Sequence, residues 1–237
     1  MSQIWLEGIF LFNLKGDHLM TYILEILPSL LDGAKLTLEI FFWTIIGSIP
    51  LGLLVGLGLI SKIKPIKYFL NFYVWLMRGT PLLLQLIFVF YGLPTLQQFH
   101  IHIVFGRYDA ALFAFILNYG AYFAEIFRGG LQSIPKGQYE SAKVLRLSYW
   151  QTIRTIVIPQ VFKIVLPSIG NEIINLVKDS SLVYVIGLGD LLRAGNVATS
   201  RDVTLVPLLM VGAIYLLLTA IFTLILKKIE KHYSYYK

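Results

Sequence analysis

Six polar or charged side chains recur at helical spacing inside an apolar stretch that is long enough to cross a bilayer. They are Ser168, Asn171, Glu172, Asn175, Lys178 and Asp179. At about 100° per residue, all six fall within an arc of roughly 120° on one helix face. Ionisable groups at bilayer depth cost roughly 2.5–3.5 kcal/mol each, so they face a bundle interior or a watery cavity. The stripe carries both signs of charge, as a zwitterionic amino acid does, and one interpretation is a substrate path.

Helix packing is the alternative interpretation of this stripe, with Lys178 and Asp179 placed at an interfacial mouth. The path interpretation adds Arg78 and Gln85 from an earlier apolar span, where Gln85 follows Pro81 by four residues and shares its face. Proline is acceptable in a first helical turn and costly in a helix interior. The stretch from Arg78 to Pro81 is therefore also typical of a helix start that leaves Arg78 at the membrane surface.

A further set of polar side chains lies on the span between these two. Asn118, Tyr122 and Glu125 are spaced i, i+4 and i+7, and so share one helix face. Arg128 follows Glu125 by three residues, which predicts an ion pair between their side chains.

The composition places these groups in a membrane protein. Of the 237 residues, 57% are hydrophobic and 14% are charged, whereas a soluble domain would carry roughly 25% charged residues. The mean hydropathy is +0.74. The chain has no cysteine, which excludes disulfides, thiolate metal sites and cysteine nucleophiles. His100 and His102 alternate with no further ligand nearby, so no metal site is expected.

Five apolar segments are long enough to cross a bilayer, which takes roughly 20 residues. They run over about 34–60, 68–93, 110–127, 161–188 and 205–226. Residues 4–31 are interrupted by charges and Pro28, and we expect one or two short interfacial helices there, a sixth span being the alternative. The predicted fold is an all-α membrane protein. Residues 1–33 form an extracytoplasmic or interfacial segment, 34–227 one transmembrane domain, and 228–237 a tail.

The basic residues cluster at the ends of the spans, which is a signal of topology rather than of nucleic-acid binding. Residues 61–67, 128–163 and 227–237 hold thirteen of the twenty Lys and Arg, and the loops on the other side hold five. The positive-inside rule predicts that the C-terminus and a loop over about 129–159 are cytoplasmic. The N-terminus is then outside a bacterial cell membrane that the chain crosses several times.

Residues 139–159 form a charged, amphipathic segment between two spans. Glu140, Ser141 and Ala142 begin it, and Ile156 to Pro159 end it. This spacing resembles the EAA loop of bacterial ABC importer permeases, which reads E-A-A, three residues, G, nine residues, I-x-L-P. Arg146 stands where the pattern has Gly. The resemblance implies a docking helix for a cytoplasmic ATPase, with Glu140 as its polar contact and Ala142 as a small residue that lets helices approach. The implied coupling residues are Gly137, Tyr139, Glu140, Ser141, Ala142, Arg146 and Leu147.

Three further stretches are similar to the permeases of polar amino acid importers, the histidine, glutamine, arginine and glutamate type. They are Arg78–Gln85, Glu125–Gly137 and Gly170–Gly195. The resemblance covers roughly residues 30–230. It implies a five-span permease fold, a second permease subunit that is identical or a sister, an ATPase dimer, and an extracytoplasmic amino-acid-binding protein. It also implies alternating access driven by ATP.

Other functional classes find little support in the residues. The chain has no G-x-x-x-x-G-K-[ST] phosphate loop, so ATP and Mg²⁺ are expected on a partner ATPase and no cofactor on this chain. No Ser/His/Asp set or pair of carboxylates in an open cleft is evident, so no catalytic residue and no intramembrane enzyme is expected. A stand-alone ion-coupled transporter would show two similar halves, and none is visible.

Overall fold

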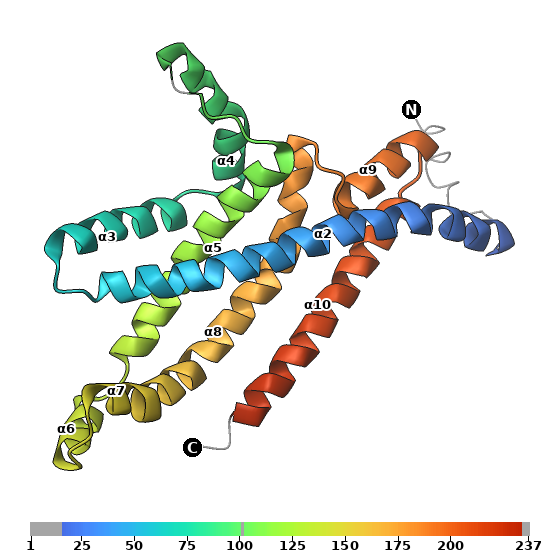
Figure 1. The fold of residues 1–237 in the computed structure, drawn as a ribbon. Helices are drawn as coiled ribbons and strands as arrows, with labels where there is room; N and C mark the ends of the chain where they lie inside the picture. The colour runs from blue at the N-terminus through green and yellow to red at the C-terminus, as the bar shows by residue number, and fades with distance from the viewer. Residues whose placement is uncertain (1–15, 101, 234–237) are drawn as a thin grey trace, which may run out of the picture.

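The computed structural model describes residues 16–100 and 102–233, and helices are the only regular secondary structure within them (Figure 1). The elements are α2 (Gly16–Leu59), α3 (Lys64–Gly79), α4 (Leu82–Ile87), η2 (Phe88–Gly92), η3 (Leu93–Phe99), α5 (Arg107–Gln132), α6 (Lys136–Val144), α7 (Tyr149–Thr152), η4 (Ile153–Val157), α8 (Ile158–Asp179), η5 (Ser180–Ile186), α9 (Leu191–Asp202) and α10 (Val206–Tyr233).

Five segments of the described chain are long and apolar enough to cross a membrane, which confirms the predicted number. They are Leu19–Leu59, Leu82–Phe99, Arg107–Gln132, Tyr149–Ile186 and Val206–Tyr233. The all-α fold is also confirmed. The last helix continues through Tyr233, so the described part of the predicted tail, 228–233, is helical.

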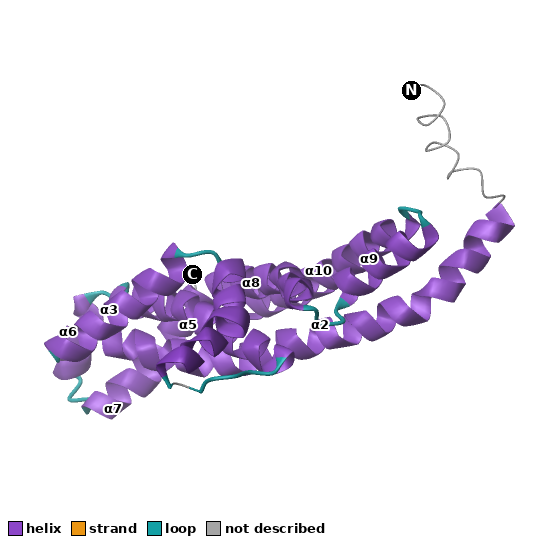
Figure 2. Ribbon diagram, turned by 90° about the horizontal axis from the view of Figure 1, so that it is seen from above, coloured by secondary structure: helices purple, strands orange, loops and turns teal. Residues whose placement is uncertain are grey.

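The N-terminal half of α2 differs from the prediction. Residues 16–31 are not separate short helices but the first turns of a 44-residue helix that runs through Pro28; residues 1–15 lie outside the described part. Packing explains the continuity, because Ile26 and Leu30 are buried against Leu191 of α9 and Val211 of α10. Figure 2 shows α2 extending along the molecule beside α9 and α10.

The second predicted span, 68–93, is broken in two. Thr80 adopts an extended conformation (φ −121°, ψ 145°) between α3 and α4, and Pro81 precedes the first residue of α4. A residue before proline is pushed out of the α region, and proline lacks the amide that would continue the helix. The chain therefore changes direction here, as the ribbon shows, and α4 with η2 and η3 forms the span (Figure 1).

The centre of the bundle is α5, which packs against α2, α3, α4 and α8. Glycine permits a close contact between α2 and α5, since a Cβ on Gly52 of α2 would stand 2.5 Å from Cβ of Phe123. Phe115 and Phe123 of α5 are fully buried in the main core with Leu176 of α8. The close packing of α4 and α8 against α5 thus sets the positions of the polar residues on those two helices.

Candidate functional site

A polar cavity of about 720 Å³ lies between the break before α4, the middle of α5 and the C-terminal half of α8. Its lining combines two basic groups, two acidic groups, two amides and two phenols. The polar lining residues are Arg78, Thr80, Asn118, Tyr119, Tyr122, Glu172, Asn175, Lys178 and Asp179. Groups of both charge signs thus face one space inside a helical bundle.

Four of the six residues in the predicted α8 stripe line this cavity: Glu172, Asn175, Lys178 and Asp179. Ser168 and Asn171 lie nearer the start of α8; they are exposed and are not among the lining residues. Asn175 and Lys178 are exposed too, and Glu172 and Asp179 are half-buried. This part of α8 therefore presents its polar face to a cavity, rather than burying it against the other helices of the same chain.

Asp179, the last residue of α8, is held by α5. The hydroxyl of Tyr119 donates a hydrogen bond of 2.7 Å to its Oδ2. Tyr119 is itself only 2% exposed. The sequence analysis missed Tyr119, although its spacing of three residues from Tyr122 places both on the helix face that was identified. This donor fixes the orientation of the Asp179 carboxylate and leaves its other oxygen available to further donors.

The break before α4 is stabilised by two side-chain amides. Gln85 Nε2 donates to the carbonyl of Met77 at 2.9 Å and to Oγ1 of Thr80 at 2.8 Å. Asn118 Nδ2 donates to the same Met77 carbonyl at 3.0 Å and to Oε1 of Gln85 at 3.0 Å. Carbonyls freed where a helix breaks need such donors inside a membrane. Gln85, predicted as a path residue, thus supports the cavity wall and is not among the residues that line it.

Arg78 stands between this cavity and a second one of about 420 Å³, since it lines both. Its guanidinium lies 5.2 Å from the centre of the Tyr122 ring, and Nη1 lies 3.8 Å from Oε2 of Glu125. Glu125 also accepts from Nε of Arg128 at 3.2 Å, which confirms the predicted ion pair. Arg78 is partly exposed, shares the Glu125 carboxylate with Arg128 and also lines the main cavity.

The predicted coupling loop folds as two short helices with a tight turn between them. The amide of Leu147 donates to the carbonyl of Ala142 at 3.0 Å, and that of Arg146 donates to the carbonyl of Lys143 at 2.9 Å. This pair of bonds ends α6 with Arg146 in the left-handed region, at φ 56°. The residue that replaces the family's glycine therefore keeps the turn, at a conformational cost that glycine would not bear.

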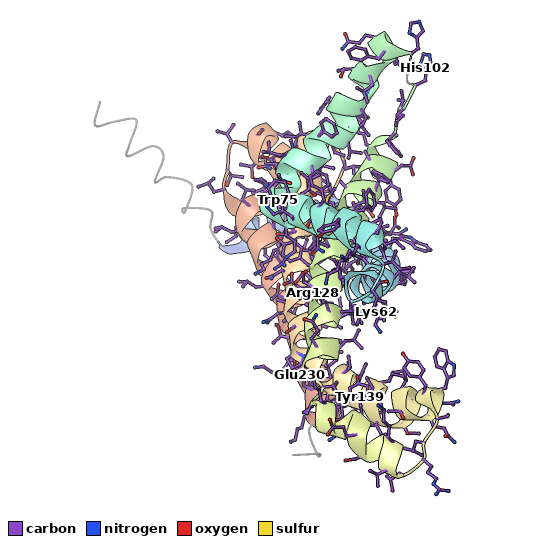
Figure 3. The ribbon with its side chains drawn as sticks, turned by 90° about the vertical axis from the view of Figure 1, so that its left-hand side faces the viewer. Lys62, Trp75, His102, Arg128, Tyr139 and Glu230 are labelled. Carbon is purple, nitrogen blue, oxygen red and sulfur yellow. The ribbon has the colours of Figure 1, made fainter. Side chains whose placement is uncertain are left out.

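The outer surface of this loop is apolar and exposed. Val144, Leu145, Tyr149 and Trp150 are between 70% and 82% exposed. Among the predicted coupling residues, Gly137, Glu140, Ser141 and Arg146 are exposed, Tyr139 and Leu147 are half-buried, and Ala142 is buried within this chain. Figure 3 places Tyr139 at the end of the molecule opposite His102. An exposed apolar patch at the tip of a loop is typical of a protein–protein contact.

A family model and individual relatives of this chain indicate the same family. Residues 48–235 match the family described as "Binding-protein-dependent transport system inner membrane component". The chain is 40% identical over 206 residues to the arginine transport system permease protein ArtQ of Bacillus subtilis, covering 86% of this chain and 92% of the relative. It is 31% identical over 217 residues to the putative glutamine transport system permease protein GlnP of Rickettsia typhi, covering 90% and 98%.

Solved structures agree with these relatives. A crystal structure of an amino acid ABC transporter with histidines has a chain that is 34% identical, with a TM-score of 0.81 and coverage of 90% of this chain and 97% of that one. An inward-facing structure of the MetNI methionine ABC transporter gives a TM-score of 0.68 at 17% identity, covering 87% and 96%. The second likeness concerns the fold alone.

Proposed function

The chain belongs to the family of binding-protein-dependent transport system inner membrane components, and we propose that it is the membrane-spanning permease subunit of an ATP-driven importer for a polar amino acid. The observation that carries the substrate class is the mixed charge of the cavity: Arg78 and Lys178 beside Glu172 and Asp179. An uncharged solute or a simple ion would need only part of this lining.

A zwitterionic amino acid matches these groups with its own backbone charges. Lys178 or Arg78 attracts the α-carboxylate, and Glu172 or Asp179 attracts the α-ammonium. Asn118 and Asn175 supply neutral donors and acceptors for a polar side chain. Because lipid offers a charged solute no partner in transit, weak contacts shared among several groups lower the barrier without trapping the substrate.

Energy for transport comes from another chain, since this sequence lacks a phosphate-binding loop. The exposed loop from Lys136 to Thr152 supplies the docking surface for the ATPase, which binds ATP and Mg²⁺. Its exposed apolar tip, centred on Leu145 and Trp150, supplies the apolar part of this contact, and Glu140 is an exposed polar residue in the same loop. A second permease subunit and an extracytoplasmic amino-acid-binding protein complete the transporter.

The topology proposed for this assembly places the loop and the C-terminus in the cytoplasm and the N-terminus outside. The bias of thirteen basic residues against five supports it. The chain has no native cysteine, so Ser141→Cys gives a single label at the loop. An impermeant maleimide applied to intact cells is expected to leave it unlabelled, and labelling from outside would refute the topology.

Co-purification followed by transport tests the function. Affinity-tagged chain, expressed with its neighbouring genes, is expected to retain an ATPase subunit and to take up a labelled polar amino acid in proteoliposomes only when ATP and the binding protein are supplied. Uptake that persists without ATP, or that follows an ion gradient instead, would overturn the proposal.

A further inference from the structure

A second cavity, of about 420 Å³, lies between α3 and α5 and adjoins the main one. The two spaces share Arg78, Gly79 and Tyr122 in their linings. Asn71 and Trp75 of α3 and Glu125 of α5 line the second cavity alone. Its volume lies within the range of about 300–1,000 Å³ that is usual for small-molecule sites. The second cavity is therefore large enough to hold a small ligand of its own.

The second cavity lies closer to the coupling loop than the main cavity does. Glu125 stands seven residues before the end of α5 at Gln132, or about 10 Å, whereas Asn118 of the main cavity stands fourteen residues before it, or about 21 Å. The coupling loop begins with α6, a few residues after Gln132. Figure 3 places Arg128, one helical turn beyond Glu125, between Trp75 and Tyr139. In the proposed topology, the second cavity is thus on the cytoplasmic side of the main one.

Arg78 and Glu125 give the second cavity one positive and one negative group. Nη1 of Arg78 stands 3.8 Å from Oε2 of Glu125, which is longer than a hydrogen bond. The Arg78 side chain is 43% exposed and that of Glu125 is 21% exposed. A guanidinium has five N–H donors, so Arg78 can bind a further carboxylate from its place over the Tyr122 ring. The pair is loose enough for a ligand to enter between its two members.

Arg128 holds Glu125 independently of Arg78. Nε of Arg128 donates to Oε1 and to Oε2 of Glu125, each at 3.2 Å. Nη1 of Arg128 donates in turn to Oε1 of Gln132 at 3.0 Å. A carboxylate has about four lone-pair sites, so Glu125 can accept from a further donor while Arg128 stays bound. Glu125 therefore keeps its place when a ligand separates it from Arg78.

Gly79 leaves space where the two cavities meet. It is an exposed residue at the end of α3, and no atom of the described chain lies within 4 Å of the position that a Cβ on it would take. The backbone beside it is held in place, because the amides of Gln85 and Asn118 both donate to the carbonyl of Met77. Gly79 thus adds no side chain to the boundary, where bulk would narrow the connection between the cavities.

We propose that the second cavity is an exit site, which holds the transported amino acid after it leaves the main cavity. The α-carboxylate binds the guanidinium of Arg78, and the α-ammonium binds Glu125, so that the zwitterion enters between the two members of the loose pair. Because Arg78 lines both cavities, it can keep the carboxylate while the rest of the amino acid moves from one space to the other. This inference rests on the proposed function and adds a second binding site to it.

Protection of a single cysteine tests the exit site. L-Arginine, L-glutamine, L-histidine and L-glutamate are first compared for uptake by the wild type, and the one taken up fastest is the probe. Asn71→Cys places a thiol in the second cavity of a chain that has no native cysteine. Its labelling by N-ethylmaleimide is followed in nanodiscs that hold the chain with its ATPase, in the presence of ATP and the binding protein. At roughly ten times its dissociation constant the amino acid fills about nine-tenths of its sites, so labelling should slow about tenfold.

Two matched chains show where this protection arises. Lys62→Cys, an exposed position that lines neither cavity, should be labelled at the same rate with and without the amino acid. Adding Glu125→Gln to Asn71→Cys removes the partner of the α-ammonium, which should weaken binding about tenfold or more and leave protection of about twofold or less.

A substitution at Gly79 tests the connection between the cavities without altering a charge. Gly79→Leu is expected to lower uptake severalfold with the ATPase still bound, because its side chain enters the boundary. Gly212→Leu is the control, since Gly212 is an exposed residue of α10 where a Cβ would also meet no described atom within 4 Å. Unchanged uptake in Gly79→Leu would contradict passage through this boundary.

The outcomes separate the exit site from the function on which it rests. If the wild type takes up none of the four amino acids, the proposed function itself fails. If it takes up the probe but Asn71→Cys is unprotected, or is protected no more than Lys62→Cys, the exit site alone is overturned. Full protection in the presence of Glu125→Gln would also overturn it. If Glu125→Gln fails to insert, the comparison of Asn71→Cys with Lys62→Cys decides, together with uptake by Gly79→Leu.

Discussion

The hydroxyl of Tyr119 on α5 holds the carboxylate of Asp179 at the end of α8 through a 2.7 Å hydrogen bond. This contact joins residues 60 positions apart and fixes one acidic group of the cavity. In the proposed substrate path, Tyr119 is therefore a positioning residue, because it contacts Asp179 and is expected to act on the substrate only through that carboxylate.

Tyr119→Phe is expected to raise the KM for amino acid uptake severalfold. The amount of ATPase that co-purifies with the chain should change little. The substitution removes a part-buried hydrogen bond to a carboxylate, a loss of about 1.5–3 kcal/mol of stability. Tyr73→Phe is the control, because Tyr73 donates at 2.6 Å to the carbonyl of Leu117 and is not among the residues lining the main cavity. It should lower the melting temperature and leave the KM unchanged. If both variants shift the KM alike, Tyr119 has only a packing role.

Arg146→Gly is expected to stabilise the chain by about 1 kcal/mol, because glycine takes the left-handed conformation at φ 56° without the steric cost that arginine bears. Leu145→Gly, one residue earlier at φ −76°, should destabilise it by about 0.5–1 kcal/mol. Thermal unfolding in detergent measures both, and uptake should persist in the first. A lower melting temperature for Arg146→Gly would mean that the arginine side chain stabilises the turn more than its backbone strains it.

Leu145→Asp is expected to release the ATPase during affinity purification, because it places a charge in the exposed apolar tip of the coupling loop. Phe99→Asp is the matched change at the end of η3, where Phe99 is 66% exposed, and should keep the ATPase. Full retention of the ATPase by Leu145→Asp would exclude this tip as the docking surface.

We expect Asp190 to make the stability of the chain depend on pH, through the packing of α9 on α2. It is fully buried at the N-terminus of α9, where it accepts from the amides of Leu192 and Arg193. Burial raises the pKa of its carboxyl from 3.8 to about 6, although the two amides act in the opposite direction. Between these pH values the folded chain holds more protons than the unfolded chain. The free energy of unfolding therefore falls as pH rises from about 4 to about 6, and is level above that.

Asp190→Asn keeps a capping side chain and removes the buried charge, so it should abolish this slope and make the chain more stable at neutral pH. Asp190→Ala also removes the charge but loses the cap, at about 1 kcal/mol. Chemical unfolding followed across this pH range compares the three chains. A slope that survives in Asp190→Asn would assign the titration to another group.

The sequence predicts the apolar spans because they rest on local patterns, and the structure confirms their number. The coupling role of the loop between the third and fourth spans stays a prediction. Helical spacing also brings Glu172, Asn175, Lys178 and Asp179 to one face, and the structure places them in one cavity. Local patterns could not predict the partner of Asp179, since Tyr119 comes from a distant helix. They also missed the continuity of α2 through Pro28, which depends on buried contacts with α9 and α10. Pro81 indicates from the sequence that a helix begins near Thr80. The change of chain direction there could not be predicted, because it depends on the hydrogen bonds of Gln85 and Asn118 to the Met77 carbonyl.

Recognition of the zwitterion tests the central claim most directly. The uptake of a labelled polar amino acid that the wild type transports is measured in proteoliposomes that hold the chain, its ATPase and its binding protein. Asp179→Asn, Glu172→Gln and the double variant are compared with the wild type. The amount of ATPase retained by each variant is measured as a control. The account predicts ATP-driven uptake that falls at least severalfold in one or both variants, with the ATPase still bound. Uptake that is unchanged in both single variants and in the double variant would contradict a substrate path through this cavity.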